Sequence, residues 1–286
     1  MTDTAMDPPV LKNCLYKAGE SLEQNHLLLN RLNVFPVPDG DTGTNMLSTY
    51  QAGIRTLEAE SEKRNGSETI DSIASRRNEE LIKHSRGNSG FILARFFRGF
   101  FDAVEGAFLL GVEDFASGFA GGLFQVHSSL FTPVEGTMLT VIRGMSDVLR
   151  SCRHNGKKEM PLSEALSSAL EAGRKALAET PRLLPVLARA GVPDSGALGF
   201  IFLMDGFYRG LTGDPVRCER EEDYRFAPVP TATASPAPVD GRCFGFCTEV
   251  IVGAPKPFPK EGLSSFLEER GNSIALVCEE DFLKVH

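Results

Sequence analysis

The sequence predicts a mainly helical protein that ends in a small α+β unit. Over the first 212 residues, apolar side chains recur at the i, i+3, i+4, i+7 spacing of amphipathic helices. Residues 227–240 are rich in Pro, Ala and Thr, as in a semi-extended linker. Short strand-like runs follow. We therefore predict a helical domain over 1–212, a linker over 213–241, and the start of a truncated α+β unit over 242–286.

Helical periodicity predicts nine helices and no convincing strand in the first domain. One of them is a short helix that starts at Thr180-Pro181, a cap followed by proline, and ends at Gly191. The others are expected near 9–31, 45–60, 69–84, 91–97, 112–130, 138–149, 162–177 and 198–211. In the last unit, strands are expected over 244–252, 273–278 and 282–286, with a helix over 260–270.

Composition and charge exclude several classes of function. The chain has 286 residues, a net charge of −8 and a pI near 5.3, without the basic face that nucleic acids or anionic membranes require. No apolar run approaches 18 residues, and the polar N-terminus does not resemble a signal peptide. We predict a cytoplasmic protein with no membrane span and no nucleic-acid partner.

An acidic turn over residues 33–46 carries the strongest chemical signal. Asp39 and Asp41 lie two residues apart among glycines, just before an apolar helix. Mg²⁺ prefers one or two carboxylates together with substrate phosphates, and a helix start offers free N–H groups to those phosphates. The stretch therefore suits a metal ion and the phosphates it holds.

Two other interpretations of this turn compete with a magnesium site. An EF-hand loop counted from Asp39 would need Asp or Asn at Gly43 and Glu at Tyr50, so that interpretation fails. A solvated turn with two capping carboxylates remains the plain alternative.

Two further glycine-bearing turns open apolar helices, at residues 85–90 and 192–196. The first of these turns has two equally acceptable interpretations. It could be a phosphate cradle made of backbone N–H groups beside Arg86, or a simple helix connection capped by Asn88 or Ser89. It is no Walker A loop, because Gly-Lys-Ser/Thr is absent. It is no nucleophile elbow, which would need glycine at Phe91.

Four motifs in order, at residues 33–46, 86–90, 133–137 and 192–196, resemble the ATP-binding subunit of bacterial fatty acid kinase. The first domain is also similar to the nucleotide-binding subunit of dihydroxyacetone kinase, the DhaL-like domain. The resemblance covers about residues 10–212. It continues over 243–286, where Phe244 to Glu249 resembles the opening of the fatty acid kinase middle domain.

The resemblance implies an antiparallel eight-helix barrel that binds ATP or ADP and two Mg²⁺ at one end. Asp39 and Asp41 would be the catalytic metal ligands, with Asn33 as a further oxygen ligand. The residues it implies around the nucleotide are Thr42, Gly43, Thr44, Asn45, Asn88, Ser89, Gly90, Thr137, Met138, Asp194, Ser195 and Gly196.

The implied reaction transfers the γ-phosphoryl group of ATP to a fatty acid carboxylate that a lipid-binding partner protein presents. A carboxylate with a pKa of about 4–4.5 is already ionised at neutral pH, so no general base is needed. Positioning and charge neutralisation then carry the catalysis. The resemblance places most of the partner docking beyond residue 286, so we expect MgATP binding even if transfer fails.

Several alternatives stay open. A dihydroxyacetone-kinase-like protein that phosphorylates a small acceptor, or a nucleotide-binding regulatory fragment without turnover, would fit the same motifs, and the chain could form a homodimer. Cys247 and His286 match positions that resemble a structural zinc site. The Cys243 to Cys247 spacing is compatible with zinc but unspecific. Buried thiols at Cys243 and Cys278 are the plain alternative.

Overall fold

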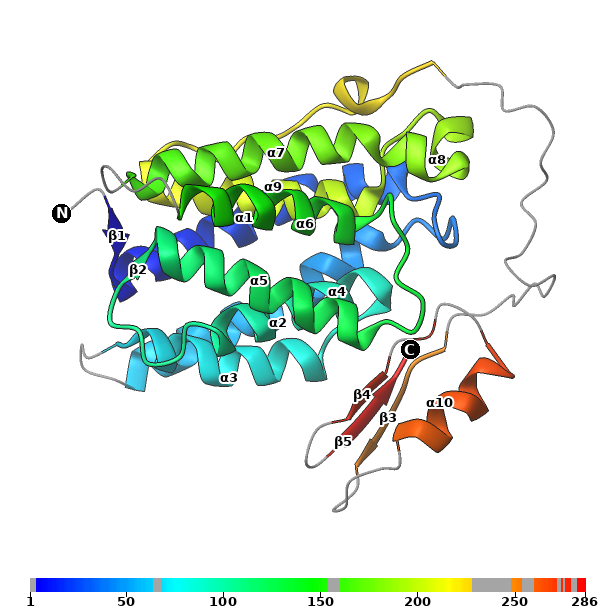
Figure 1. Ribbon diagram of the computed structural model, residues 1–286, viewed down its shortest axis with the longest axis horizontal. Coiled ribbons are helices and arrows are strands. Elements are labelled where there is room, and N and C mark those ends of the chain that lie inside the picture. The colour runs from blue at the N-terminus through cyan, green and yellow to red at the C-terminus, as the bar shows by residue number, and fades with distance from the viewer. Residues whose placement is uncertain are drawn as a thin grey trace.

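The computed structural model describes residues 4–63, 68–153, 160–227, 248–253, 260–271, 274, 276–278 and 282–286. Helices account for most of them (Figure 1). They are α1 (Pro8–Leu32), α2 (Thr42–Lys63), α3 (Ile70–Lys83), α4 (Gly87–Asp102), α5 (Val112–Ser129), α6 (Met138–Cys152), α7 (Leu162–Leu183), the short α8 (Pro185–Ala190), α9 (Ser195–Thr212), and α10 (Lys260–Glu268) near the C-terminus.

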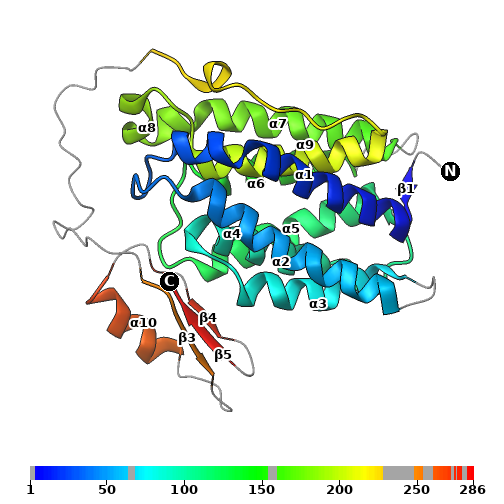
Figure 2. The ribbon, with the colours of Figure 1, turned by 180° about the vertical axis from the view of Figure 1, so that it is seen from behind.

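The eight longer helices of the first 212 residues close into an antiparallel barrel. Each of α1 to α7 packs against the next long helix in the chain, and α9 packs against α1 and so completes the ring (Figure 2). The predicted eight-helix barrel is confirmed. The predicted helices are all present, apart from shifts at their ends.

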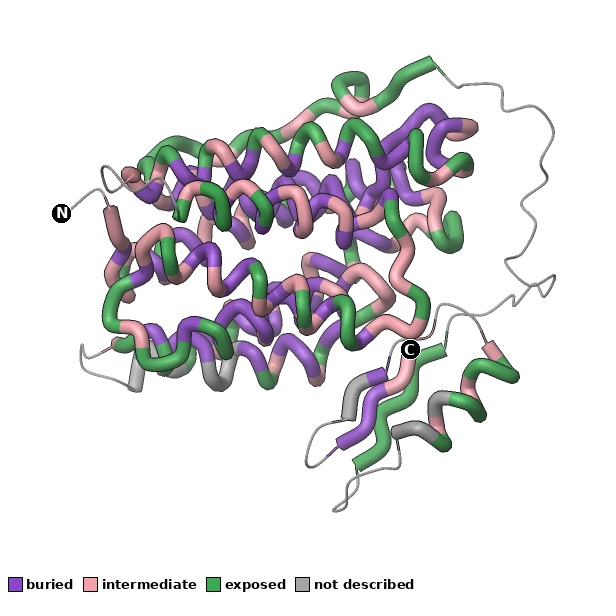
Figure 3. Tube along the Cα trace, viewed as in Figure 1, coloured by how far each residue is buried: buried purple, intermediate pink, exposed green. Residues whose placement is uncertain are grey.

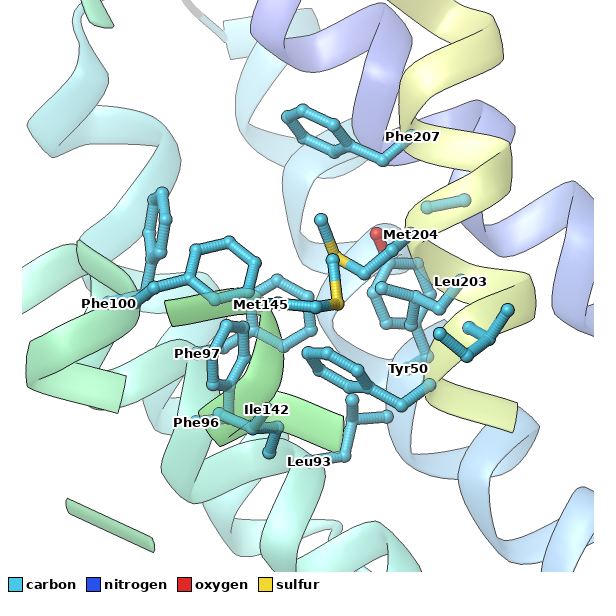
Figure 4. Close-up of a cluster of buried hydrophobic side chains, with 14 of the residues drawn as sticks. Tyr50, Leu93, Phe96, Phe97, Phe100, Ile142, Met145, Leu203, Met204 and Phe207 are labelled. Carbon is cyan, nitrogen blue, oxygen red and sulfur yellow. The ribbon is translucent and has the colours of Figure 1, made fainter. Parts of the chain in front are cut away.

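Phenylalanine rings fill the middle of the barrel (Figure 4). Phe96 of α4 meets Phe200 of α9 and Phe119 of α5 edge-on, with ring centroids 4.9 and 5.1 Å apart. Such edge-to-face pairs add stability beyond the apolar area they bury. Buried positions line the inward faces of the helices along their whole length (Figure 3). A filled core leaves the ends of the barrel for a binding site.

The helix predicted to start at Thr180-Pro181 starts four residues later. Helix α7 continues through Pro181 to Leu183, and α8 begins at Pro185. Proline lacks the N–H that would bind the carbonyl of Leu177, and the hydroxyl of Thr180 donates to that carbonyl instead, at 2.7 Å. The local hydroxyl therefore lets the helix pass the proline, and the sequence-based boundary was wrong.

Residues 213–226, the first half of the predicted linker, pack back along the barrel. The side-chain amide of Asn25 donates to the carbonyl of Arg217 at 3.0 Å, and the ring of Tyr224 meets Phe202 edge-on at 5.6 Å. The 3-10 helix η1 (Glu221–Tyr224) lies in this segment. Most of the rest of the predicted linker falls outside the described residues.

A second unit of mixed structure follows. Strands β3 (Val250–Gly253), β4 (Leu276–Cys278) and β5 (Phe282–Val285) form an antiparallel sheet in the order β3-β5-β4, accompanied by α10. The predicted strands and helix are confirmed where the structure describes them. One strand pair was not predicted: β1 (Ala5–Met6) pairs with β2 (Leu110–Gly111) at the edge of the barrel. Among the described helices, none is long and apolar enough to cross a membrane.

Candidate functional site

Four helices, α2, α4, α6 and α9, begin at the same end of the barrel, which we call the site end (Figure 1). The hydroxyl of Ser89 lies 3.5 Å from the carbonyl oxygen of Thr42. A Cβ built on Gly196 would lie 3.5 Å from the Met138 methyl and 3.9 Å from the Ser89 Cβ. The predicted motifs, far apart in sequence, therefore converge. Helix N-termini carry partial positive charge, so this end suits an anion.

The acidic turn lies between α1 and α2 at the site end. Asn33 is 6% exposed, and its side-chain nitrogen donates to Asp39 Oδ1 at 2.7 Å and to the carbonyl of Val37 at 3.2 Å. Its oxygen, Oδ1, is buried without a hydrogen-bond partner. A buried acceptor without a donor is costly, and a cation would satisfy it.

Electrostatics at the turn also favour a cation. Burial, together with the neighbouring Asp39 carboxylate, raises the pKa of Asp41 above its usual range, and the Asn45 side chain partly opposes this. Among the described residues, no three His, Cys, Asp or Glu side chains form a cluster that could hold a metal alone. The turn thus fits a hard divalent ion that takes its remaining ligands from phosphate or water.

The start of α2 is braced by α1. The side chain of Asn30 accepts from the backbone N–H of Thr44 at 3.1 Å and donates to the Thr44 hydroxyl at 2.8 Å. A Cβ on Gly43 would lie 2.0 Å from the carbonyl oxygen of His26, so only glycine fits there. Sequence reasoning misses Asn30, because an Asn near the end of a helix gives no distinctive signal.

The start of α4 is fixed by a threonine in the middle of α2. Thr49 is fully buried; its hydroxyl accepts from the N–H of Arg86 at 3.1 Å and donates to the carbonyl of Asn45 at 2.7 Å. Arg86, with extended backbone, is the N-cap residue, so the alternative in which Asn88 or Ser89 caps this helix was wrong. The turn is already held by Thr49, which leaves Asn88 and Ser89 in the first turn of α4.

Glycines let these two helix starts come close together. Gly87 has a left-handed φ of +58°, and a Cβ there would lie 2.5 Å from the Asn45 side-chain nitrogen. A Cβ on Gly90 would lie 2.3 Å from the Thr49 hydroxyl oxygen. The 86–90 and 42–45 segments thus form one joined surface.

Thr49→Val tests this joint. Valine keeps the shape but leaves the N–H of Arg86 without its acceptor, so we expect the free energy of unfolding to fall by about 1–3 kcal/mol. Thr56→Val on the same helix is the control, since the Thr56 hydroxyl donates only within its own helix, to the carbonyl of Ala52 at 3.1 Å. Urea unfolding of both variants decides; equal losses would contradict the role given to Thr49.

Asp194 joins the starts of α6 and α9. It caps α9 by accepting from the N–H of Ala197 at 2.7 Å, and it also accepts from the N–H of Met138, the first residue of α6. The hydroxyl of Thr137 donates a hydrogen bond to the carbonyl of Val134 at 2.7 Å. The Ser195 hydroxyl donates to the carbonyl of Leu29 on α1 at 2.6 Å. These side chains shape the site end.

Asp194 predicts a pH effect. Burial raises its pKa to about 7, while the N–H groups of Ala197 and Met138 oppose the rise. The folded protein holds this proton more tightly than the unfolded chain, whose Asp titrates near pH 4, so the stabilising contribution is complete below about pH 4 and is lost as the pH rises to about 7. We expect the unfolding free energy of the wild type, relative to Asp194→Asn, to fall by roughly 3 kcal/mol between pH 4.5 and 8. Urea unfolding of both proteins at the two pH values measures this difference in free energy. If the difference does not change with pH, the raised pKa of Asp194 is contradicted.

The predicted zinc ligands are only partly placed. Cys247 and Cys243 lie outside the described residues. His286 has Nδ1 3.1 Å from Glu249 Oε1. The zinc site stays a prediction.

Comparisons with known proteins agree with the fold. Residues 36–209 match the DAK2 domain, and residues 243–286 match the middle domain of proteins like the A subunit of fatty acid kinase. The chain is 31% identical to Protein YloV of Bacillus subtilis, over 100% of this chain and 52% of that protein. It is also 31% identical to an uncharacterized protein of Staphylococcus epidermidis, over 95% of this chain and 49% of the other.

A solved structure shares the architecture. The dihydroxyacetone kinase of C. freundii, crystallised with AMP-PNP and Mg²⁺, superposes with a TM-score of 0.51 and 19% identity over 72% of this chain and 34% of that one. At this identity, the likeness shows the fold alone.

The fold and the site define the class of protein. It is a helical barrel with one end where helix N-termini that favour anions meet an acidic turn. The chain belongs to the DAK2-domain family, whose match spans more than half of it. It spans about half the length of the curated relatives it matches.

Proposed function

We propose that this chain is the ATP-binding part of a fatty acid kinase, and that the site end of the barrel binds ATP with Mg²⁺. One observation carries the proposal: four helix starts converge on a turn that holds two carboxylates and a buried amide oxygen without a partner. Positive helix ends favour phosphates, and the acidic turn favours a divalent cation. A metal-bound nucleotide satisfies both.

Asp39 and Asp41, with Asn33 Oδ1, would hold Mg²⁺; the number of ions, expected to be two, is part of the proposal. Bound Mg²⁺ would neutralise charge on the transferring phosphoryl group. The backbone N–H groups at the starts of α2 and α4 orient the phosphates, and glycine at 43, 87 and 90 lets the backbone approach them. The starts of α6 and α9, joined by Asp194, flank the nucleoside side of the site.

For the acceptor we propose a fatty acid carboxylate, presented by a lipid-binding partner protein. The match of residues 243–286 to a fatty acid kinase middle domain supports this choice over a small hydroxy-ketone acceptor. A carboxylate is ionised at neutral pH, so no side chain has to remove a proton before it attacks phosphorus. In this proposal, catalysis comes from positioning the carboxylate and the phosphoryl group in a site whose charges are already arranged for the transfer. The domain division at 212 and 241 belongs to this proposal.

The proposed function is tested by supplying acceptors. The purified chain is incubated with MgATP, a fatty acid and a candidate fatty-acid-binding protein, and acyl phosphate is trapped as its hydroxamate. A parallel reaction contains dihydroxyacetone instead. Hydroxamate that depends on the binding protein supports the proposal. Phosphorylated dihydroxyacetone without hydroxamate would favour the small-acceptor alternative, and nucleotide binding without any transfer would favour a regulatory fragment.

A further inference from the structure

The second unit contacts the barrel at the first residue of α4. The carboxylate of Glu249 accepts a hydrogen bond from the backbone N–H of Gly87 at 2.7 Å. The first N–H groups of a helix have no partner inside that helix, and they are the groups that bind anions. In this structure, a carboxylate from the chain itself fills one anion position at the site end.

The contact is anchored by Lys284 on β5. Lys284 is 2% exposed, and its ammonium donates to the backbone oxygen of Ser85 and to the Ser85 hydroxyl, the latter at 2.9 Å. Nearby, the ammonium of Lys83 lies 6.0 Å from the ring centroid of Phe282, which belongs to the core cluster of the barrel. Figures 1 and 2 show the sheet beside the site end from both sides. Glu249 is thus held at Gly87 by a packed strand.

The second unit also places a histidine near the acidic turn. His286 Nδ1 lies 3.1 Å from Glu249 Oε1, and the charge of a protonated His286 would act on Asp41 of the acidic turn. The partnerless oxygen of Asn33 belongs to the same acidic turn. The second unit therefore reaches both halves of the proposed site, the phosphate cradle and the metal turn.

We propose that Glu249 is an autoinhibitory carboxylate, which occupies a phosphate position at the start of α4 until a nucleotide displaces it. The inference rests on the proposed function of the site end. A carboxylate and a phosphate compete for the same N–H and repel each other at close range. Nucleotide binding must therefore release Glu249 from Gly87, which couples occupancy of the barrel to the position of the second unit.

The test measures the Kd of AMP-PNP with Mg²⁺ for the full chain and three variants. Glu249→Ala removes the competing carboxylate. Glu249→Asp keeps the charge but shortens the side chain by one methylene, so it no longer reaches Gly87. We expect both to lower Kd by about three- to tenfold. Glu268→Ala, which removes an exposed carboxylate from α10 in the same unit, is the control and should leave Kd within about twofold.

The outcomes separate the two proposals. Unchanged or weaker binding in both Glu249 variants, with binding by the wild type, overturns the autoinhibitory role and leaves the nucleotide site standing. Tighter binding in the Ala variant alone would mean that charge acts at a distance, which also overturns the contact mechanism. If neither wild type nor variants bind, the proposed nucleotide site fails and the inference fails with it.

Discussion

Asp39→Asn and Asp41→Asn should each weaken Mg²⁺-dependent nucleotide binding by at least about 100-fold. Each change removes one of the two carboxylates that would hold the ion, and metal sites lose roughly 10- to 100-fold in affinity even when only a supporting residue is lost. The Kd of AMP-PNP, measured in Mg²⁺ for the wild type and both variants, gives the result directly. In EDTA neither variant should bind more weakly than the wild type, because the wild type then keeps both carboxylates against the phosphates.

Folding provides the control for these variants. The two carboxylates repel each other in the metal-free protein, and burial already raises the pKa of Asp41. Replacing either one should therefore leave the melting temperature without metal unchanged or slightly higher. Unchanged nucleotide affinity in Mg²⁺ for both variants would remove the acidic turn from the proposed site.

Gly43→Ala should cause the largest loss of stability among the substitutions considered. The new methyl group would lie 2.0 Å from the carbonyl oxygen of His26, and neither backbone can yield without separating α1 from α2. We expect a loss of at least about 3 kcal/mol, or roughly 5–10 °C in melting temperature. Because Gly43 belongs to the acidic turn, nucleotide binding should weaken as well.

A glycine with free space around it is the matched control. Gly262 on α10 has nothing within 4 Å of the position that an alanine methyl would take, so Gly262→Ala should be neutral or slightly stabilising, as for any exposed helical glycine. Thermal melts of both variants separate the cost of the steric clash at Gly43 from the effect of replacing a helical glycine that has free space around it. A Gly43→Ala protein as stable as the wild type would mean that the α1–α2 contact is not tight.

The helices and the acidic turn could be predicted because their signals are local. The 3.6-residue period marks α1 and α6 without any tertiary information, and the carboxylate pair stands next to a helix start in the sequence itself. The convergence of residues 42, 89, 138 and 196 could not be predicted from periodicity, which does not say which helix ends meet; only the family resemblance implied it. That step depends on how the ring of helices closes.

The residues that were missed act over long distances in the chain. In the sequence, Thr49 looks like an ordinary polar residue within a helix. Its hydroxyl nevertheless accepts a hydrogen bond from the N–H of Arg86, 37 positions further along the chain. Glu249 meets Gly87 across 162 positions, and no spacing rule connects them. The helix start misplaced at Pro181 has another cause: one threonine hydroxyl satisfied the carbonyl that the proline left open.

Titration calorimetry shows whether the site end of the barrel binds a metal-bound nucleotide. ATP is titrated into the purified chain with Mg²⁺ and then with EDTA. We expect saturable binding in Mg²⁺ that weakens at least about 100-fold in EDTA, because the carboxylates then repel the phosphates without a bridging ion. Equal binding in both conditions, or none by a folded protein in Mg²⁺, would contradict it.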